Sequence, residues 1–188
     1  MPRFTRAELE SYRGAEVPDL LGPGLRLLFV GINPGLWTAA TQTHFAHPVN
    51  RFYPALLKAG IIDRRMDPAA GMTDADRDYL RGRGIGITNL VRRATSRADE
   101  LTADELRAGA AALTALVEEM RPSVVAVAGI TAYRQAFGDR KATAGRQPQR
   151  LGGAELWVVP NPSGLNAHHT VATLADAYAE PARAAGIL

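Results

Sequence analysis

The chain carries the run LLFVGINPG at residues 27–35, in which four apolar residues lead directly into a Gly-rich turn. A short, continuous apolar run bounded by Gly and Pro is typical of a strand that is covered on both faces. The turn places the uncharged amide of Asn33 just past the carboxyl end of that strand. Ligands bind at this edge in open α/β sheets, so the run predicts a parallel sheet and one side of a site.

A second run of the same kind lies near the end of the sequence. LWVVPNPSGL at residues 156–165 again passes from an apolar strand into a turn that presents an asparagine, Asn161. Because the carboxyl ends of parallel strands meet at one edge of a sheet, we expect Asn33 and Asn161 to contribute to one composite site.

Strand and helix patterns alternate along the rest of the chain. Apolar runs predict strands at residues 26–32, 85–90, 124–128 and 156–159. Helical patterns lie at residues 5–12, 52–59, 73–81, 102–120, 131–137 and 170–179. This alternation predicts an α/β fold, a parallel sheet with helices on both faces. We expect residues 138–153 to form a surface loop that leads into the last strand.

Length and composition narrow the class of protein. The 188 residues fit one domain, in which we expect residues 1–24 to pack on or flank the rest. The chain has no Cys, which excludes disulfides, thiolate catalysis and Cys-ligated metals. The first twenty residues contain no apolar stretch of secretory or membrane-spanning length, so we expect a cytoplasmic location.

The positive charge is carried almost entirely by arginine, and the net charge is +3. Arginine makes forked contacts with phosphate that lysine cannot make, so basic clusters suit a polyanion such as nucleic acid. An arginine-rich but simply solvated surface remains the alternative for each cluster. The three clusters are Arg77, Arg81 and Arg83; Arg92, Arg93 and Arg97; and Arg140, Lys141, Arg146 and Arg150.

Two loop residues near the expected site each allow two interpretations. Phe45, in FAHPVNRF at residues 45–52, could stack on a planar ligand or fill the core. Leu165, in the loop after the last strand, could be an exposed wedge between bases or a buried anchor. A metal site at His44 and His47 is disfavoured because Pro48 follows and no third ligand is nearby.

The segments together resemble the mismatch-specific uracil–DNA glycosylase family, which includes the thymine–DNA glycosylases. GINPG at residues 31–35, FAHPVNRF at 45–52 and NPSGL at 161–165 match family motifs in order. GITNLV at residues 86–91 resembles an inner strand of the family, and the likeness covers roughly residues 25–178. Asn166 replaces the final Ser of the last motif, and Trp37 stands where small residues are common.

This resemblance implies a three-layer α/β sandwich with a central four-stranded parallel sheet. It also implies that Asn33 is the catalytic residue and orients the attacking water. It assigns base binding to Gly31, Ile32, Phe45, Asn89 and Asn161. It assigns the loop that enters the DNA to Ser163, Gly164, Leu165, Asn166 and His168. Neither a metal nor another cofactor is implied.

The implied activity is that of a monofunctional DNA glycosylase. Such an enzyme flips uracil, and in some members thymine or a modified cytosine, out of a mismatch with guanine and hydrolyses its N-glycosidic bond, which starts base excision repair. We expect a monomer that acts on double-stranded DNA near the nucleoid of a bacterial cytoplasm. A non-catalytic binder of mismatched or damaged DNA is the alternative. A nucleotide enzyme is disfavoured because the sequence lacks a phosphate-binding loop.

Overall fold

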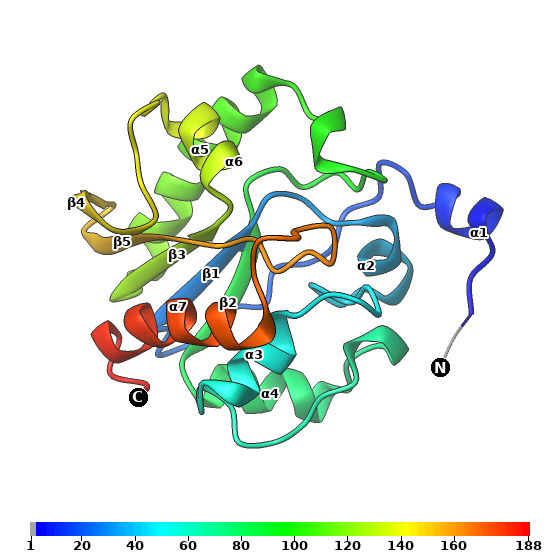
Figure 1. The fold of residues 1–188 in the computed structure, drawn as a ribbon, viewed down its shortest axis with the longest axis horizontal. Helices are drawn as coiled ribbons and strands as arrows, with labels where there is room; N and C mark the ends of the chain where they lie inside the picture. The colour runs from blue at the N-terminus through cyan, green and yellow to red at the C-terminus, as the bar shows by residue number, and fades with distance from the viewer. Residues whose placement is uncertain (1–2) are drawn as a thin grey trace.

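The computed structural model describes residues 3–188 and places one five-stranded sheet between two layers of helices (Figure 1). The strand order is β2-β1-β3-β5-β4. The four parallel strands are β1 (Leu27–Gly31), β2 (Ile85–Asn89), β3 (Val124–Ala128) and β5 (Ala154–Val159). These confirm the strands predicted from the apolar runs, with ends shifted by one or two residues. The α/β sandwich is therefore as expected.

The fifth strand corrects two expectations. β4 (Gly145–Leu151) pairs antiparallel with β5 at the edge of the sheet, so the sheet is not four-stranded and residues 138–153 are not only loop. The segment GRQPQRL escaped prediction because only Gln147 and Leu151 are buried, so no apolar run marks it. Pro148 falls where the pairing register shifts, a position that an edge strand tolerates.

Helices cover both faces of the sheet. Each predicted helix is present, although α7 continues through Pro181 beyond its predicted end at residue 179. One helix, α2, was not predicted, because six residues are too few to display a helical period. The helices are α1 (Arg6–Glu10), α2 (Leu36–Thr41), α3 (Phe52–Lys58), α4 (Asp74–Gly82), α5 (Ala103–Met120), α6 (Ile130–Phe137) and α7 (Val171–Ala184), with 3₁₀ turns at Pro68–Ala70 and Ala98–Glu100.

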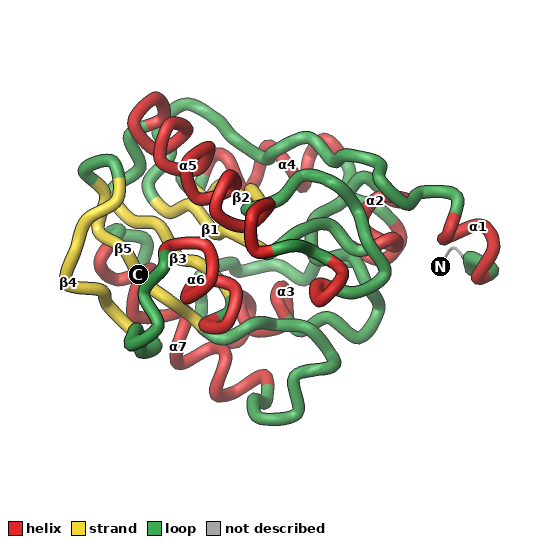
Figure 2. Tube along the Cα trace, turned by 90° about the horizontal axis from the view of Figure 1, so that it is seen from above, coloured by secondary structure: helices red, strands yellow, loops and turns green. Residues whose placement is uncertain are grey.

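Alternate residues of β1 separate the core into two layers. Leu27 and Phe29 face α3, α4 and α7, while Leu28 and Val30 face α5 and α6. Figure 1 shows these two helical layers on opposite sides of the strands, and Figure 2 looks down through them from the side of α5 and α6. Because both faces of β1 are covered, all five of its residues are buried, as a continuous apolar run predicts.

Helix α5 illustrates why the predicted helices form where they do. The Thr102 hydroxyl accepts a hydrogen bond from Glu105 N at 3.1 Å, and the Glu105 carboxylate accepts one from Thr102 N at 2.8 Å. This capping box satisfies two backbone N–H groups that the first turn leaves free. The helix ends at Arg121 in a left-handed conformation, directly before Pro122.

The segment before β1 packs against β2 and the loop that follows β2. Gly14 N donates to Ala94 O at 2.9 Å, and Ala94 N donates to Ala15 O at 2.9 Å. Val17 and Leu20 are buried, and Leu20 pairs with Ile87 of β2. This segment therefore supports the loop after β2. Within residues 3–188, no helix combines the length and the apolar character needed to cross a membrane.

Candidate active site

A cleft of about 760 Å³ opens at the carboxyl ends of the parallel strands. Its walls are the turn after β1, residues 44–50, the loop after β2, the start of α6 and the loop after β5. The structure brings every site residue suggested by the sequence to this one cleft. They are Gly31, Ile32, Asn33, Phe45, Asn89, Asn161, Ser163, Gly164, Leu165, Asn166 and His168.

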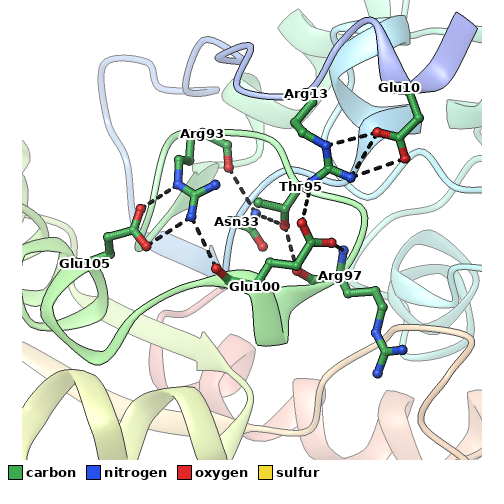
Figure 3. A network of polar contacts seen from close by, with 8 residues as sticks. All are labelled: Glu10, Arg13, Asn33, Arg93, Thr95, Arg97, Glu100 and Glu105. Carbon is green, nitrogen blue, oxygen red and sulfur yellow. Dashed lines mark hydrogen bonds and ion pairs between the residues drawn. The ribbon is translucent and has the colours of Figure 1, made fainter. Parts of the chain in front are cut away.

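Asn33 is held by hydrogen bonds that fix the orientation of its amide. Its Nδ2 donates to the Arg93 carbonyl at 3.0 Å and to Thr95 Oγ1 at 2.7 Å (Figure 3). Thr95 gives its own hydroxyl proton to the Arg97 carbonyl at 2.7 Å, so it can only accept from Asn33. With Nδ2 bonded to two acceptors, Oδ1 is left as the free hydrogen-bond acceptor of Asn33.

An ion pair fixes the backbone that holds Asn33. The Arg93 guanidinium makes a forked contact with the Glu105 carboxylate, at 2.5 Å and 3.1 Å. The hydrogen bond from Arg93 lowers the pKa of Glu105 to about 2. Glu105 also caps the N-terminus of α5. The ion pair therefore ties Arg93, whose carbonyl accepts from Asn33, to the start of this helix.

The N-terminal segment contacts the same loop from the other side. The Glu100 carboxylate accepts a hydrogen bond from Arg97 N at 2.9 Å and also binds the Arg13 guanidinium. Arg13 is paired in turn with Glu10, as Figure 3 shows. The pKa of Glu100 is lowered, chiefly by its bond with Arg13. The loop that supports the candidate catalytic amide is therefore tied down at both ends.

The inner end of the cleft combines an aromatic ring with an amide. Phe45 stacks on Phe52 with 4.1 Å between ring centroids, lines the cleft and adopts a left-handed backbone with φ of 56°. This geometry joins the two interpretations of Phe45, since the ring contributes to the core and also lines the cleft. A Cβ at Gly31 would lie 2.5 Å from Asn89 Oδ1 and 3.3 Å from the Phe45 ring, so any side chain there would displace the Asn89 amide.

A buried histidine, for which the sequence suggested no role except the disfavoured metal site, contacts Asn89. His44 is 6% exposed, and burial lowers its pKa, which favours the neutral ring. Its Nδ1 lies 3.2 Å from Asn89 Nδ2, and its Nε2 lies 2.8 Å from the Pro18 carbonyl. Its position directly before Phe45 was the one sequence signal available.

The loop after β5 is folded by its own side chains. Asn161 Oδ1 accepts from Ser163 N at 3.0 Å, and Ser163 Oγ accepts from Leu165 N at 3.2 Å. Asn166, the departure from the family motif, donates Nδ2 to Asn161 O at 3.0 Å and accepts from His168 N at 3.1 Å. Both oxygens of Asn161 therefore accept hydrogen bonds from within the loop, although Asn161 also lines the cleft.

Arg51, which belongs to the FAHPVNRF segment, bonds the backbone of the same loop. Its backbone N donates to Pro162 O at 3.0 Å, and its guanidinium donates to the carbonyls of Ser163 and Asn166, each at 2.6 Å, and of His169. These bonds join the loop after β5 to the start of α3. Its place in the FAHPVNRF segment is the sequence signal for this backbone-bonding role, although the carbonyls that it binds lie in a distant part of the chain.

The tip of that loop is apolar and exposed. Leu165 is 86% exposed, which rules out the buried-anchor interpretation. The neighbouring Gly164 lies so close to Val49 that a Cβ there would be 2.4 Å from the valine side chain. Close packing of the loop on residues 47–51 therefore presents Leu165 outward beside the cleft.

Most of the clustered basic side chains are paired outside the cleft. In the first cluster, Arg77, Arg81 and Arg83 form ion pairs with Asp74, Asp78 and Asp63. Across residues 3–188, Arg97 is the one member of the three clusters that lines the cleft, and it pairs with Asp99 at 2.7 Å. Arg140, Lys141 and Arg150 lie exposed in the third cluster. The clusters therefore do not form one basic surface around the cleft.

Trp37 does not narrow the cleft, because its side chain lies elsewhere. Its ring packs edge-on against Phe4 and His47, and its Nε1 donates to the Ala69 carbonyl at 3.2 Å. Trp37 is absent from the residues that line the cleft in the described part of the chain. The bulky side chain at this position therefore supports the surrounding loops.

These features define an α/β protein that presents polar and aromatic groups in a cleft at the carboxyl edge of its parallel strands. The chain belongs to the uracil DNA glycosylase superfamily, whose family model matches residues 18–182. This membership supports a DNA glycosylase, a hydrolase that acts on DNA.

A solved structure is similar in fold. It is the solution NMR structure of a protein described as a "putative Uracil DNA glycosylase" from Methanosarcina acetivorans, with a TM-score of 0.55 and 17% sequence identity. The similarity covers 89% of this chain and 98% of that chain. At this level of identity the likeness concerns the fold, a sheet flanked by helices.

Proposed function

We propose that the protein is a monofunctional DNA glycosylase that hydrolyses the N-glycosidic bond of uracil mispaired with guanine in double-stranded DNA. The observation that carries the proposal is the fixed amide of Asn33, which leaves an acceptor oxygen free in a cleft that Phe45 and Asn89 also line. Superfamily membership supports the reaction class.

Asn33 is suited to holding a water molecule. An amide does not titrate near neutral pH, so Asn33 cannot remove a proton from water. Its Oδ1 can accept a hydrogen bond from water and aim the oxygen at the sugar. As the C1′–N1 bond breaks, its electron pair leaves with the base, the water oxygen bonds to C1′, and the water gives up a proton to solvent. Catalysis of this kind depends on positioning, so we expect slow turnover.

The departing base needs stabilisation because negative charge develops on it. The backbone N–H groups of Ile32 and Phe45 donate no hydrogen bond within residues 3–188, and both residues line the cleft. Unpaired N–H groups in a cleft can donate to a developing anion without reorganisation. The ring of Phe45 offers a flat surface on which the base would stack.

Access to the base requires that it leaves the duplex. Flipping a nucleotide costs a few kcal/mol and costs least when the base is mispaired. The exposed side chain of Leu165 is an apolar wedge of the kind that fills the space left in the stack. Arg97, His47 and His168 line the cleft and are suited to nearby phosphates, so binding should weaken as salt increases.

The test is single-turnover release of free uracil from duplexes that contain G·U or A·U pairs. The proposal predicts release from both, faster from G·U because the mispaired base opens at lower cost. Tight binding to G·U duplexes with no release of uracil would contradict it and favour the non-catalytic binder. Equal release from duplex and free nucleotide would instead favour a small-molecule enzyme.

A further inference from the structure

The hydrogen bonds of His44 determine which way the Asn89 amide faces. The Pro18 carbonyl can only accept, so the His44 Nε2 that lies 2.8 Å from it carries the ring proton. In the neutral ring Nδ1 is then an acceptor. Asn89 must therefore turn its Nδ2, and not its Oδ1, toward Nδ1 at 3.2 Å.

The oxygen of Asn89 consequently lies on the cleft side of the amide. Asn89 Oδ1 is the atom that a Cβ at Gly31 would meet at 2.5 Å, beside the edge of the Phe45 ring. Gly31, Phe45 and Asn89 all line the cleft. The inner end of the cleft thus contains a hydrogen-bond acceptor whose orientation is set by the bond between Asn89 and the buried His44 ring.

We propose that His44 is a specificity-determining positioning residue that holds Asn89 with its oxygen toward the base. An acceptor in this place suits uracil and thymine, whose N3 carries a proton, and opposes cytosine, whose N3 is itself an acceptor. A buried acceptor left without a donor is costly, so the orientation discriminates between these bases. The inference rests on the proposed function, because it concerns the same cleft.

The test compares His44→Leu, which removes both ring nitrogens, with His44→Gln, whose amide keeps one donor and one acceptor. Tyr53→Phe is the matched control, since Tyr53 donates to the His44 backbone carbonyl at 2.9 Å and makes no bond with Asn89. Release of uracil and of cytosine is measured at single turnover in duplexes that place thymine opposite either base. Both bases are then mispaired, so the cost of opening the pair is similar. The full-length protein is used throughout.

We expect His44→Leu to lower the ratio of uracil release to cytosine release about tenfold or more, the scale of one hydrogen bond left unmade. His44→Gln should keep most of that ratio, and Tyr53→Phe should keep all of it. A His44→Leu variant that folds and retains the wild-type ratio would overturn the inference, because a purely structural histidine would change both rates together.

A second measurement avoids the variants altogether. Long-range ¹H–¹⁵N NMR of the wild-type protein reports which ring nitrogen of His44 carries the proton. The inference requires protonation at Nε2, and protonation at Nδ1 would overturn it. This result does not depend on activity: a protein with the Nε2–H ring that releases no base from any duplex would refute the proposed function instead.

Discussion

Thr95 accepts the amide proton of Asn33 at 2.7 Å and donates its own proton to the Arg97 carbonyl, also at 2.7 Å. The two bonds run in one direction, from Asn33 through Thr95 to the backbone of the loop after β2. A rotated Asn33 amide would set its oxygen against the Arg93 carbonyl, 3.0 Å from the present nitrogen, where both atoms are acceptors. The position of Asn33 Oδ1, the oxygen proposed to hold the attacking water, therefore depends on the loop after β2.

Replacing the hydroxyl of Thr95 tests this dependence. Thr95→Val keeps the shape of the buried side chain but removes the acceptor for Asn33, so we expect about a tenfold lower single-turnover rate of uracil release. Thr95→Ser should retain most of the rate. Affinity for a G·U duplex should be unchanged in both variants. Equal rates for the Val and Ser variants would show that the hydroxyl does not act through Asn33.

Asn33→Asp is predicted to lower the rate of uracil release, by about tenfold at neutral pH. Side-chain chemistry alone favours the opposite, because a carboxylate activates water better than an amide does. The structure argues against that expectation: one carboxylate oxygen would occupy the site of Nδ2 and face the Arg93 carbonyl at 3.0 Å without a proton between them. A rate above wild type would show that the loop adjusts to a carboxylate.

Leu165→Ala should impair flipping of the base out of the duplex without destabilising the protein. Because Leu165 is 86% exposed, we expect its replacement to change the free energy of unfolding by less than about 0.5 kcal/mol. Uracil release from a G·U duplex should fall, whereas release from single-stranded DNA, which needs no wedge, should stay at the wild-type rate. A parallel loss on both substrates would assign Leu165 to the chemistry and not to opening.

The ion pair between Arg93 and Glu105 predicts a pH dependence of stability. The pKa of Glu105 falls from 4.5 to about 2 on folding, so its contribution is complete above about pH 4.5 and is lost as the pH falls toward 2. Urea unfolding of the wild type and of Glu105→Gln should therefore differ most at pH 7 and converge near pH 2. A difference that stays constant with pH would mean that the charge is not involved.

The apolar runs before Asn33 and Asn161 were sufficient to predict the parallel sheet and the common edge of the site. A continuous apolar pattern indicates burial, and β1 is buried on both faces while β5 is buried except at Glu155 and Trp157, which are partly exposed. β4 was missed for the same reason, since GRQPQRL exposes most of its residues at the edge of the sheet. An apolar pattern cannot reveal β4, because this strand is defined by its hydrogen bonds with β5 and not by burial of its side chains.

The partners of the site residues could not be predicted either. Asn33 bonds with residues 60 and 62 positions away, and Arg51 binds carbonyls more than 110 positions away. Backbone carbonyls act as partners whatever their side chains, so these bonds leave no trace in residue types. The motifs identified the residues at the cleft, while the orientation of each amide came only from three-dimensional contacts.

One carboxylate at the cleft offers a different catalytic group. Asp99 lines the cleft and pairs with Arg97 at 2.7 Å, and in the described part of the chain no other acidic residue lines it. The neighbouring carboxylate of Glu100 already accepts hydrogen bonds from Arg13 and from Arg97 N. A test of Asn33 must therefore include Asp99→Asn as a comparison.

The most direct measurement is the single-turnover rate of uracil release from a G·U duplex by the wild type, Asn33→Ala and Asp99→Asn, with duplex affinity measured alongside. We predict a loss of about a hundredfold or more for Asn33→Ala, with affinity for the duplex retained, and a near-wild-type rate for Asp99→Asn. Wild-type release by Asn33→Ala, together with loss of release by Asp99→Asn, would contradict the account and place the chemistry on the carboxylate.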